Sequence, residues 1–347
     1  MFLRGSKIGK SYKPDSSLRS QRFAGKVNPD EREVLCFSGK GIMKAFFAFA
    51  GQGAQAVGMG KDLYDKYPAA KAVFDEADAA LGYSISELCF EGPAEKLTET
   101  IYCQPAIYTM SVACLEAFRS RFGESVLPTA CAGLSLGEYG ALYAAGTFNF
   151  AEGLKLLARR AELMDKACNE TKGAMASVLS TERSVIKEVC GGCEVDIANF
   201  NSPGQVVISG DKAQVIRAIK LLQEKGLKKI IPLNVAGAFH SRLMKSAGVG
   251  LKPVLNAAGL KMPTVPVYHN LTAAPAATLP ELKTNLAGQV AGSVRWEESV
   301  KAMVAAGADT MIEFGPGTVL TGLLRRTLPD VKYFNINSVE TLEAFTL

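Results

Sequence analysis

The stretch Ala130-Cys131-Ala132-Gly133-Leu134-Ser135-Leu136-Gly137-Glu138-Tyr139 predicts the centre of the fold. A short apolar run ends in Gly-x-Ser-x-Gly and good helix formers follow, an order typical of a strand, a sharp turn and a helix. Such a turn strains the serine backbone, and its two glycines leave space where a Cβ would collide with the neighbouring strand and helix. Ser135 is therefore a candidate nucleophile, and the main-chain N–H of Leu136 a candidate oxyanion donor. A tight turn without chemistry fits the same pattern, so a base must come from elsewhere.

Composition and charge exclude several classes of protein. The chain has 347 residues, 48% hydrophobic and 21% charged, as in a globular protein with one large domain or a large domain with an insert. No apolar run approaches the roughly 18 residues of a membrane span, so we expect no membrane partner. The net charge of +5 lies entirely in residues 1–42, which carry nine Lys/Arg and four acids. The rest is neutral, and nucleic-acid binding therefore has no electrostatic support.

Residues 1–42 have no hydrophobic periodicity, and we expect a disordered leader or extension. One interpretation is a transit peptide, which would direct the chain to a plastid or mitochondrion. The other is an extension without function, with the working chain starting at Met43. The acidic run Asp30-Glu31-Arg32-Glu33 favours the second interpretation, and hence a cytoplasmic protein.

The eight cysteines lie mostly in apolar segments without regular spacing, as buried free thiols do in a reducing compartment. Cys190 and Cys193 form a C-x-x-C pattern, but no second Cys or Cys/His pair is spaced to complete a zinc site. We therefore expect no metal site.

The order of predicted elements indicates an α/β protein. Apolar segments at 44–50 and 130–133 read as buried strands, and 61–80, 104–122 and 151–168 as helices. Residues 173–238 read β-α-β-β-α-β, which is a ferredoxin-like unit inserted into the larger domain. We therefore expect a leader (1–42), a catalytic domain (43–172 and 239–347) and a small domain (173–238).

The chain has only two histidines, which narrows the search for a base. His269 ends a predicted strand, where a structural role is common, whereas His240 lies where the chain re-enters the large domain. Because active sites gather at such junctions, His240 is the better candidate. On the helix 151–168, the adjacent Arg159 and Arg160 cannot share a face, so at most one can point into a site.

At five places the chain resembles the malonyl-CoA:acyl carrier protein transacylase family. The five motifs occur in the family's order and at similar separations: Gly51-Gln52-Gly53-Ala54-Gln55, Gly133-Leu134-Ser135-Leu136-Gly137-Glu138-Tyr139, Asn199-Phe200-Asn201-Ser202-Pro203-Gly204-Gln205, Ala238-Phe239-His240-Ser241 and Glu313-Phe314-Gly315-Pro316-Gly317. The resemblance covers residues 44 to about 327. It implies an α/β-hydrolase-like core with a parallel sheet and an inserted ferredoxin-like small domain.

The resemblance also implies roles for individual residues. Ser135 would be the nucleophile, His240 the base and Gln289 the residue that positions the histidine. The N–H groups of Gln52 and Leu136 would form the oxyanion hole. Substrate contacts are implied for three residues: Arg160, which would bind the malonyl carboxylate, Asn201 beside the cleft and Phe239 in the malonyl-selective form of its motif.

The function implied by this resemblance is ping-pong transfer of malonyl from malonyl-CoA to the phosphopantetheine thiol of acyl carrier protein, supplying fatty acid biosynthesis. A serine hydrolase or thioesterase, and a malonyl transferase of a polyketide pathway, are the alternatives. We expect no cofactor, with CoA only as a substrate, and a monomer. The chain departs from the family at Leu134, where many members have His, and at Ala50, where many have Pro.

Overall fold

The computed structural model of the protein describes residues 43–347. The expectation of a disordered leader concerns residues 1–42 and so lies outside the described part. No helix among residues 43–347 has both the length and the apolar character needed to cross a bilayer.

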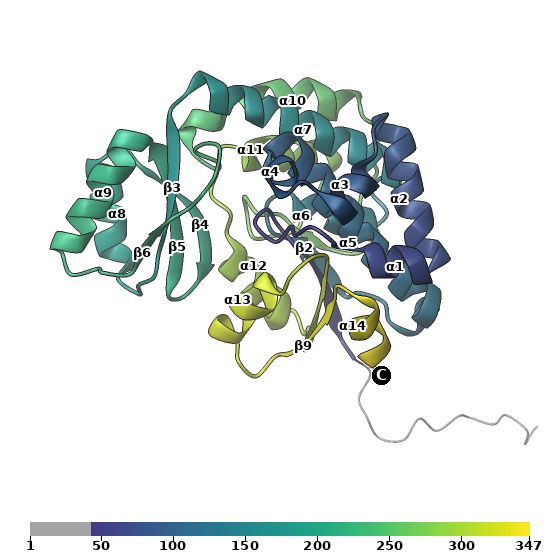
Figure 1. Cartoon of the computed structure of the whole chain (residues 1–347). Coiled ribbons are helices and arrows are strands. Elements are labelled where there is room, and N and C mark those ends of the chain that lie inside the picture. Colours follow the sequence, from purple (N-terminus) through teal and green to yellow (C-terminus); the bar gives the residue numbers. More distant parts are fainter. Residues whose placement is uncertain (1–42) are drawn as a thin grey trace, which may run out of the picture. The chain divides into compact units, whose positions relative to one another are not determined.

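The described chain alternates helices and strands (Figure 1). The strands are β1 (Ala45–Phe49), β2 (Ala130–Gly133), β3 (Gly173–Val178), β4 (Asp196–Ser202), β5 (Gln205–Asp211), β6 (Ile230–Pro232), β7 (Val267–Tyr268), β8 (Thr310–Phe314) and β9 (Lys332–Ile336). The helices are α1 (Lys61–Lys66), α2 (Pro68–Leu81), α3 (Ile85–Glu91), α4 (Ala94–Thr98), α5 (Thr100–Phe122), α6 (Gly137–Ala144), α7 (Phe150–Glu170), α8 (Arg183–Gly192), α9 (Lys212–Glu224), α10 (Lys245–Ala257), α11 (Leu279–Gln289), α12 (Trp296–Ala305), α13 (Val319–Thr327) and α14 (Val339–Ala344).

Five parallel strands form the larger sheet, in the order β7-β2-β1-β8-β9. Alternate side chains of β1 enter two different apolar clusters, because successive residues of a strand point to opposite faces. Phe47 and Phe49 pack in the cluster that contains α5 and α7, whereas Phe46 and Ala48 pack with residues of α12 and α13. Both faces of β1 are buried, which explains why its sequence is a continuous apolar run.

The smaller sheet is antiparallel, in the order β4-β5-β3-β6, and α8 and α9 supply the helical side of its apolar core. The chain order β3-α8-β4-β5-α9-β6 is the predicted β-α-β-β-α-β order. The expected fold class, an α/β core with a parallel sheet plus a smaller ferredoxin-like unit, is confirmed. The domain boundaries at 172/173 and 238/239 stay a prediction.

A short stretch of backbone between α11 and α12 forms hydrogen bonds with the small sheet. Val294 donates its N–H to Ala198 O at 2.8 Å and accepts the N–H of Phe200 at 2.9 Å. A half-buried ion pair between Arg183 and Glu297 adds a side-chain contact between α8 and α12. The small sheet is therefore tied to the segment that directly follows Gln289.

The structure differs from the sequence-based expectations at two places. The helix expected over 104–122 begins four residues earlier, at Thr100, so Pro105 lies inside α5. The sequence 61–80 forms two helices, because Tyr67 adopts an extended backbone before Pro68 starts α2.

All cysteines that the described part contains are free and buried. Burial raises the pKa of the Cys103, Cys114 and Cys131 thiols to about 12. These side chains act as small apolar groups in the core.

Phe314 of β8 is the centre of an aromatic cluster that packs the sheet against α5. Its ring centroid lies 4.9 Å from Phe47, 5.6 Å from Phe49 and 5.4 Å from Phe118. We expect Phe314→Ala to lower the free energy of unfolding by about 3–5 kcal/mol, because the cavity cannot fully collapse. Urea unfolding measures this loss. Leu127→Ala is the control, since Leu127 is 62% exposed. An equal loss of unfolding free energy in this variant would contradict the packing role of Phe314.

Candidate active site

Ser135 lies on the sharp turn between β2 and α6 that its sequence predicts. Its φ is 54°, in the left-handed region that a non-glycine residue rarely adopts. The two glycines of the motif are required by close approaches. A Cβ on Gly133 would collide with the main chain of Gly137, and a Cβ on Gly137 would collide with Phe49 O. The turn therefore holds Ser135 in a strained conformation above the end of β2.

His240 and Ser135 lie within hydrogen-bonding distance, although 105 residues separate them in the chain. Ser135 Oγ lies 2.7 Å from His240 Nε2, and His240 Nδ1 lies 2.8 Å from the main-chain oxygen of Gln289. Because that carbonyl can only accept, Nδ1 carries the proton and Nε2 is left as the acceptor. The tautomer is therefore the one in which histidine can take the serine proton.

His240 is buried, and this changes its acid–base behaviour. Burial, and to a smaller extent the positive charge of Arg160, lower its pKa from 6.5 to about 4, against the raising effect of the hydrogen bond to Gln289. The imidazole is therefore neutral at pH 7 and ready to act as a base.

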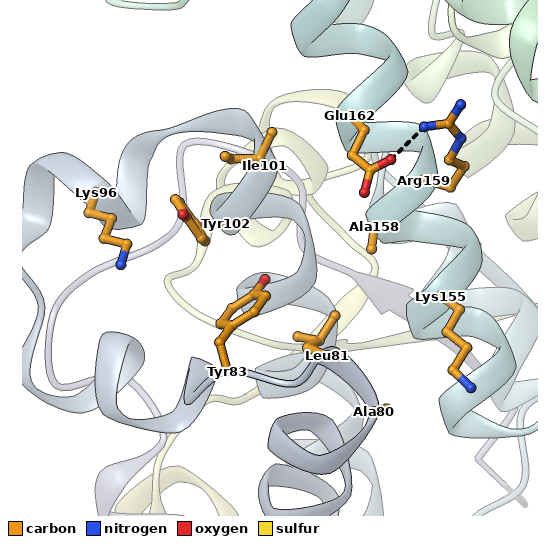
Figure 2. A pocket seen from close by; sticks show the side chains of 10 residues that line it. All are labelled: Ala80, Leu81, Tyr83, Lys96, Ile101, Tyr102, Lys155, Ala158, Arg159 and Glu162. Atoms are coloured by element: carbon orange, nitrogen blue, oxygen red, sulfur yellow. Dashed lines mark hydrogen bonds and ion pairs between the residues drawn. The ribbon is translucent and has the colours of Figure 1, made fainter.

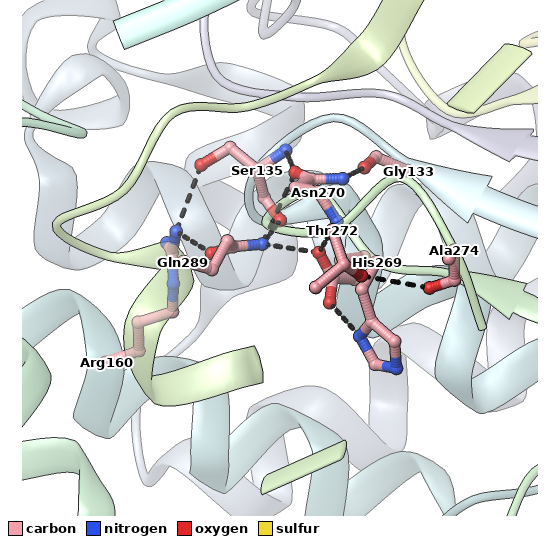
Figure 3. Close-up of polar contacts among 9 residues, drawn as sticks. Gly133, Ser135, Arg160, His269, Asn270, Thr272, Ala274 and Gln289 are labelled. Carbon is pink, nitrogen blue, oxygen red and sulfur yellow. Dashed lines mark hydrogen bonds and ion pairs between the residues drawn. The ribbon is translucent and has the colours of Figure 1, made fainter. Parts of the chain in front are cut away.

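Arg160 of α7 is buried with its guanidinium beside the nucleophile. Its Nη2 lies 3.0 Å from Ser135 Oγ and 2.9 Å from Gln289 Oε1, and Nη1 donates to Gln104 Oε1. These partners are neutral, and no ion pair among residues 43–347 includes Arg160; Figure 3 shows its contacts with Ser135 and Gln289. Burial lowers its pKa. The result is a buried cation with amide partners at the nucleophile.

The adjacent Arg159 points to the other face of α7, as helical geometry requires. It pairs with Glu162 at 2.6 Å and lines a pocket of about 620 Å³ together with Lys155, Tyr83 and Tyr102 (Figure 2). None of the predicted site residues lines this pocket. Of these two arginines, Arg160 lies beside Ser135 and Arg159 does not, in line with the expectation that they cannot share a face.

The glycine-rich loop after β1 lies against the serine turn. Leu134 donates its N–H to Phe49 O at 3.1 Å, and a Cβ on Gly51 would approach Leu134 O to 2.6 Å. Within residues 43–347, no acceptor is found for the main-chain N–H of Gln52 or Leu136. The assignment of these two groups to an oxyanion hole stays a prediction.

Asn201 and Phe239 have different surroundings. Asn201 lies on β4, and its buried Oδ1 has no hydrogen-bond partner in the described part of the chain. Phe239 is buried in the larger apolar cluster, next to His240 in sequence. Neither side chain hydrogen-bonds to Ser135, His240 or Arg160, so their substrate contacts stay predictions.

Sequence reasoning missed a buried polar cluster formed by Glu138, His269, Asn270 and the side chain of Gln289. The last three residues are labelled in Figure 3. Asn270 Oδ1 accepts the N–H of Ser135 at 2.6 Å, and its Nδ2 donates to Gly133 O at 2.7 Å. Glu138 stands in the motif itself, three residues after the serine. A carboxylate on the buried start of a helix was the signal that could have revealed it.

The burial of His240 predicts that Ser135 stays reactive at a lower pH than it would beside an ordinary histidine. We expect the rate of Ser135 modification by a sulfonyl fluoride to stay near its neutral value down to about pH 5 and to fall around pH 4. The reason is that the neutral imidazole persists until the lowered pKa. Because an unfolded histidine protonates near 6.5, the fold loses stability as pH falls from 6.5 toward 4. A fall centred at 6.5 in folded protein would contradict the assignment, and His240→Ala provides the control without a base.

Comparisons with known proteins agree with this geometry. Residues 46–342 match the acyl transferase domain family. A malonyl CoA-acyl carrier protein transacylase of Bacillus subtilis is 43% identical over 307 residues, 87% of this chain and 96% of that protein. The crystal structure of an acyl-carrier-protein-S-malonyltransferase from Bartonella henselae superposes with a TM-score of 0.83 at 38% identity, covering 87% of this chain and 98% of that one. A malonyl-transacylase solved in complex with the acyl carrier protein of a type II polyketide synthase has a TM-score of 0.82 at 36% identity, with 86% and 98% covered. The chain belongs to the acyl transferase family.

Proposed function

We propose that this acyltransferase moves the malonyl group from malonyl-CoA to the phosphopantetheine thiol of acyl carrier protein through a malonyl-serine intermediate. The observation that carries the proposal is the buried guanidinium of Arg160, 3.0 Å from Ser135 Oγ. A buried cation without a carboxylate partner favours an anionic ligand. In malonyl thioesters one methylene separates the carboxylate from the reacting carbonyl, so a cation beside the nucleophile suits a short diacid.

In the first half-reaction Ser135 Oγ attacks the thioester carbonyl while His240 Nε2 takes the hydroxyl proton. The oxyanion would accept hydrogen bonds from the N–H groups of Gln52 and Leu136, each of which can contribute roughly 3–4 kcal/mol. The C–S bond then breaks, His240 returns the proton to the CoA sulfur, and malonyl remains on Ser135 as an ester.

In the second half-reaction the thiol of the carrier attacks the malonyl-serine ester, and His240 now takes the thiol proton. The serine oxygen leaves and recovers the proton, so the enzyme returns to its starting state. Arg160 would keep the acyl group in one orientation by bidentate contacts with its carboxylate in both steps. Every proton transfer in this scheme uses His240, so we propose no metal or cofactor.

A serine hydrolase would use the same turn and base, but the relatives named above favour acyl transfer. The relative solved with its carrier supports acyl carrier protein as the partner and keeps polyketide synthesis beside fatty acid biosynthesis as the pathway. The monomeric state and the cytoplasmic location stay predictions.

Incubation with labelled malonyl-CoA in the absence of carrier should leave one label on Ser135. The label should then move to added acyl carrier protein, because the ester is a competent intermediate. Peptide mapping locates the label, and Ser135→Ala should accept none. Rapid release of free malonate, without any transfer to the carrier, would favour the hydrolase instead.

Arg160→Ala should shift the substrate preference from malonyl-CoA toward acetyl-CoA. The loss of a charge-assisted bidentate contact corresponds to about tenfold to a hundredfold in the ratio of the two kcat/KM values. Arg159→Ala is the matched control, since the neighbouring arginine faces the other side of α7. An unchanged ratio in the Arg160 variant, or an equal change in both variants, would refute the role of Arg160.

A further inference from the structure

We propose that Glu138 is a positioning residue, which acts through the side chain of Gln289 to hold Arg160 over the nucleophile and so sets the preference for malonyl. The inference rests on the proposed function and deepens it. It separates two roles of Gln289: its main-chain oxygen holds His240, and its side chain holds Arg160.

Glu138 is a fully buried carboxylate beneath the active site. Its Oε2 accepts the main-chain N–H of Asn270 at 2.9 Å and the side-chain amide Nε2 of Gln289 at 2.8 Å. Its Oε1 lies 2.6 Å from Nδ1 of His269. A buried carboxylate with three such partners has one geometry available to it, since losing any partner would leave a polar group unsatisfied.

The surroundings of Gln289 determine which way its amide points (Figure 3). Nε2 faces oxygen atoms: Ser135 O at 2.8 Å, Glu138 Oε2 at 2.8 Å and Asn270 Oδ1 at 3.4 Å. Oε1 faces the guanidinium of Arg160 at 2.9 Å. A flipped amide would place oxygen against these acceptors and an NH₂ group against the cation. Glu138, the only charged acceptor of the three, therefore favours the orientation that presents Oε1 to Arg160.

Gln289 Oε1 is one of three acceptors of Arg160, and one of the other two is the reactive hydroxyl. The guanidinium also donates to the amide oxygen of Gln104 and to the hydroxyl of Ser135, the group that must leave its resting contacts to react. The charge of Glu138 also raises the pKa of Arg160, against the larger lowering by burial. Glu138 thus acts on Arg160 by charge and, through one amide, by hydrogen bonding.

A second contact of Glu138 leads to the nucleophile itself. The N–H of Asn270 donates to Glu138, and the side chain of Asn270 bridges Ser135 N–H and Gly133 O. A disturbed Glu138 should therefore slow every acyl substrate through Ser135. It should slow malonyl more, because only malonyl also uses Arg160.

The test compares Glu138→Met with Glu138→Gln. Methionine has a similar length but no comparable acceptor, so the Gln289 amide loses its hydrogen bond as well as the charge, whereas glutamine removes only the charge. Glutamine keeps an oxygen for Asn270 and Gln289 and can place its NH₂ group toward His269. We expect the ratio of malonyl to acetyl kcat/KM to fall about tenfold or more in Glu138→Met and to stay within about threefold of wild type in Glu138→Gln.

Active sites are counted by the burst of labelled acyl-enzyme, so that misfolded protein does not enter the ratio. Glu313→Met is the matched control. Glu313 is another buried carboxylate, 1% exposed, which binds Thr321, the main-chain N–H of Leu320 and Asn335 instead of site residues. We expect it to lower the melting temperature without changing the ratio.

A double-mutant cycle with Gln289→Met tests the route of the effect. Gln289→Met keeps the carbonyl that holds His240 and removes only the side-chain amide. If Glu138 acts through this amide, the double variant should show the same ratio as Gln289→Met alone.

Three results would overturn the inference while wild type transfers malonyl: an unchanged ratio in Glu138→Met, an equal change in Glu313→Met, or additive changes in the double variant. If wild type itself forms no malonyl-serine, the proposed function fails, and this inference fails with it.

Discussion

The burial of one positive charge is the constraint on which the active site depends. Arg160 is removed from water by the packing of α7 and donates its hydrogen bonds to two amide oxygens and one hydroxyl. A buried cation with neutral partners is costly. The surrounding polar groups, from Gln104 on α5 to Gln289 at the end of α11, are arranged to reduce that cost while leaving the charge available to an anion.

The same charge links substrate binding to base chemistry. Arg160 lowers the pKa of His240, in addition to the larger effect of burial. A bound carboxylate would offset the guanidinium charge, and the imidazole would become a stronger base when a diacid is present. With the proposed roles of Arg160 and His240, the site would combine selection of the acyl group with activation of the serine. An acyl group without a carboxylate would gain neither effect.

The sequence predicted the backbone of the site better than its polar contacts. The spacing Gly133, Ser135, Gly137 predicts the turn, because only that pattern avoids the collisions seen at both glycines. The β-α-β-β-α-β order followed from periodicity alone. Helical periodicity places Arg159 and Arg160 on different faces of α7. It cannot say which of the two faces lies against Ser135, 25 residues before Arg160.

The cluster of Glu138, His269 and Asn270 depends on the parallel pairing of β2 with β7, which brings together residues 131 positions apart. No local pattern encodes that contact. The sequence likewise could not show that Gln289 makes two separate contacts, because its main chain and its side chain bind different partners. Long-range pairing and main-chain chemistry are the two physical properties that residue types alone do not reveal.

The buried cysteines have a consequence for a protein that handles thioesters. Exchange of an acyl group onto sulfur requires a thiolate that can reach the carbonyl carbon. Cys131 stands four residues before Ser135, yet it is fully buried and its pKa is about 12. Its sulfur therefore remains protonated and out of reach. The seven cysteines among residues 43–347 are all buried, so a malonyl group carried on Ser135 would be protected from capture by these thiols.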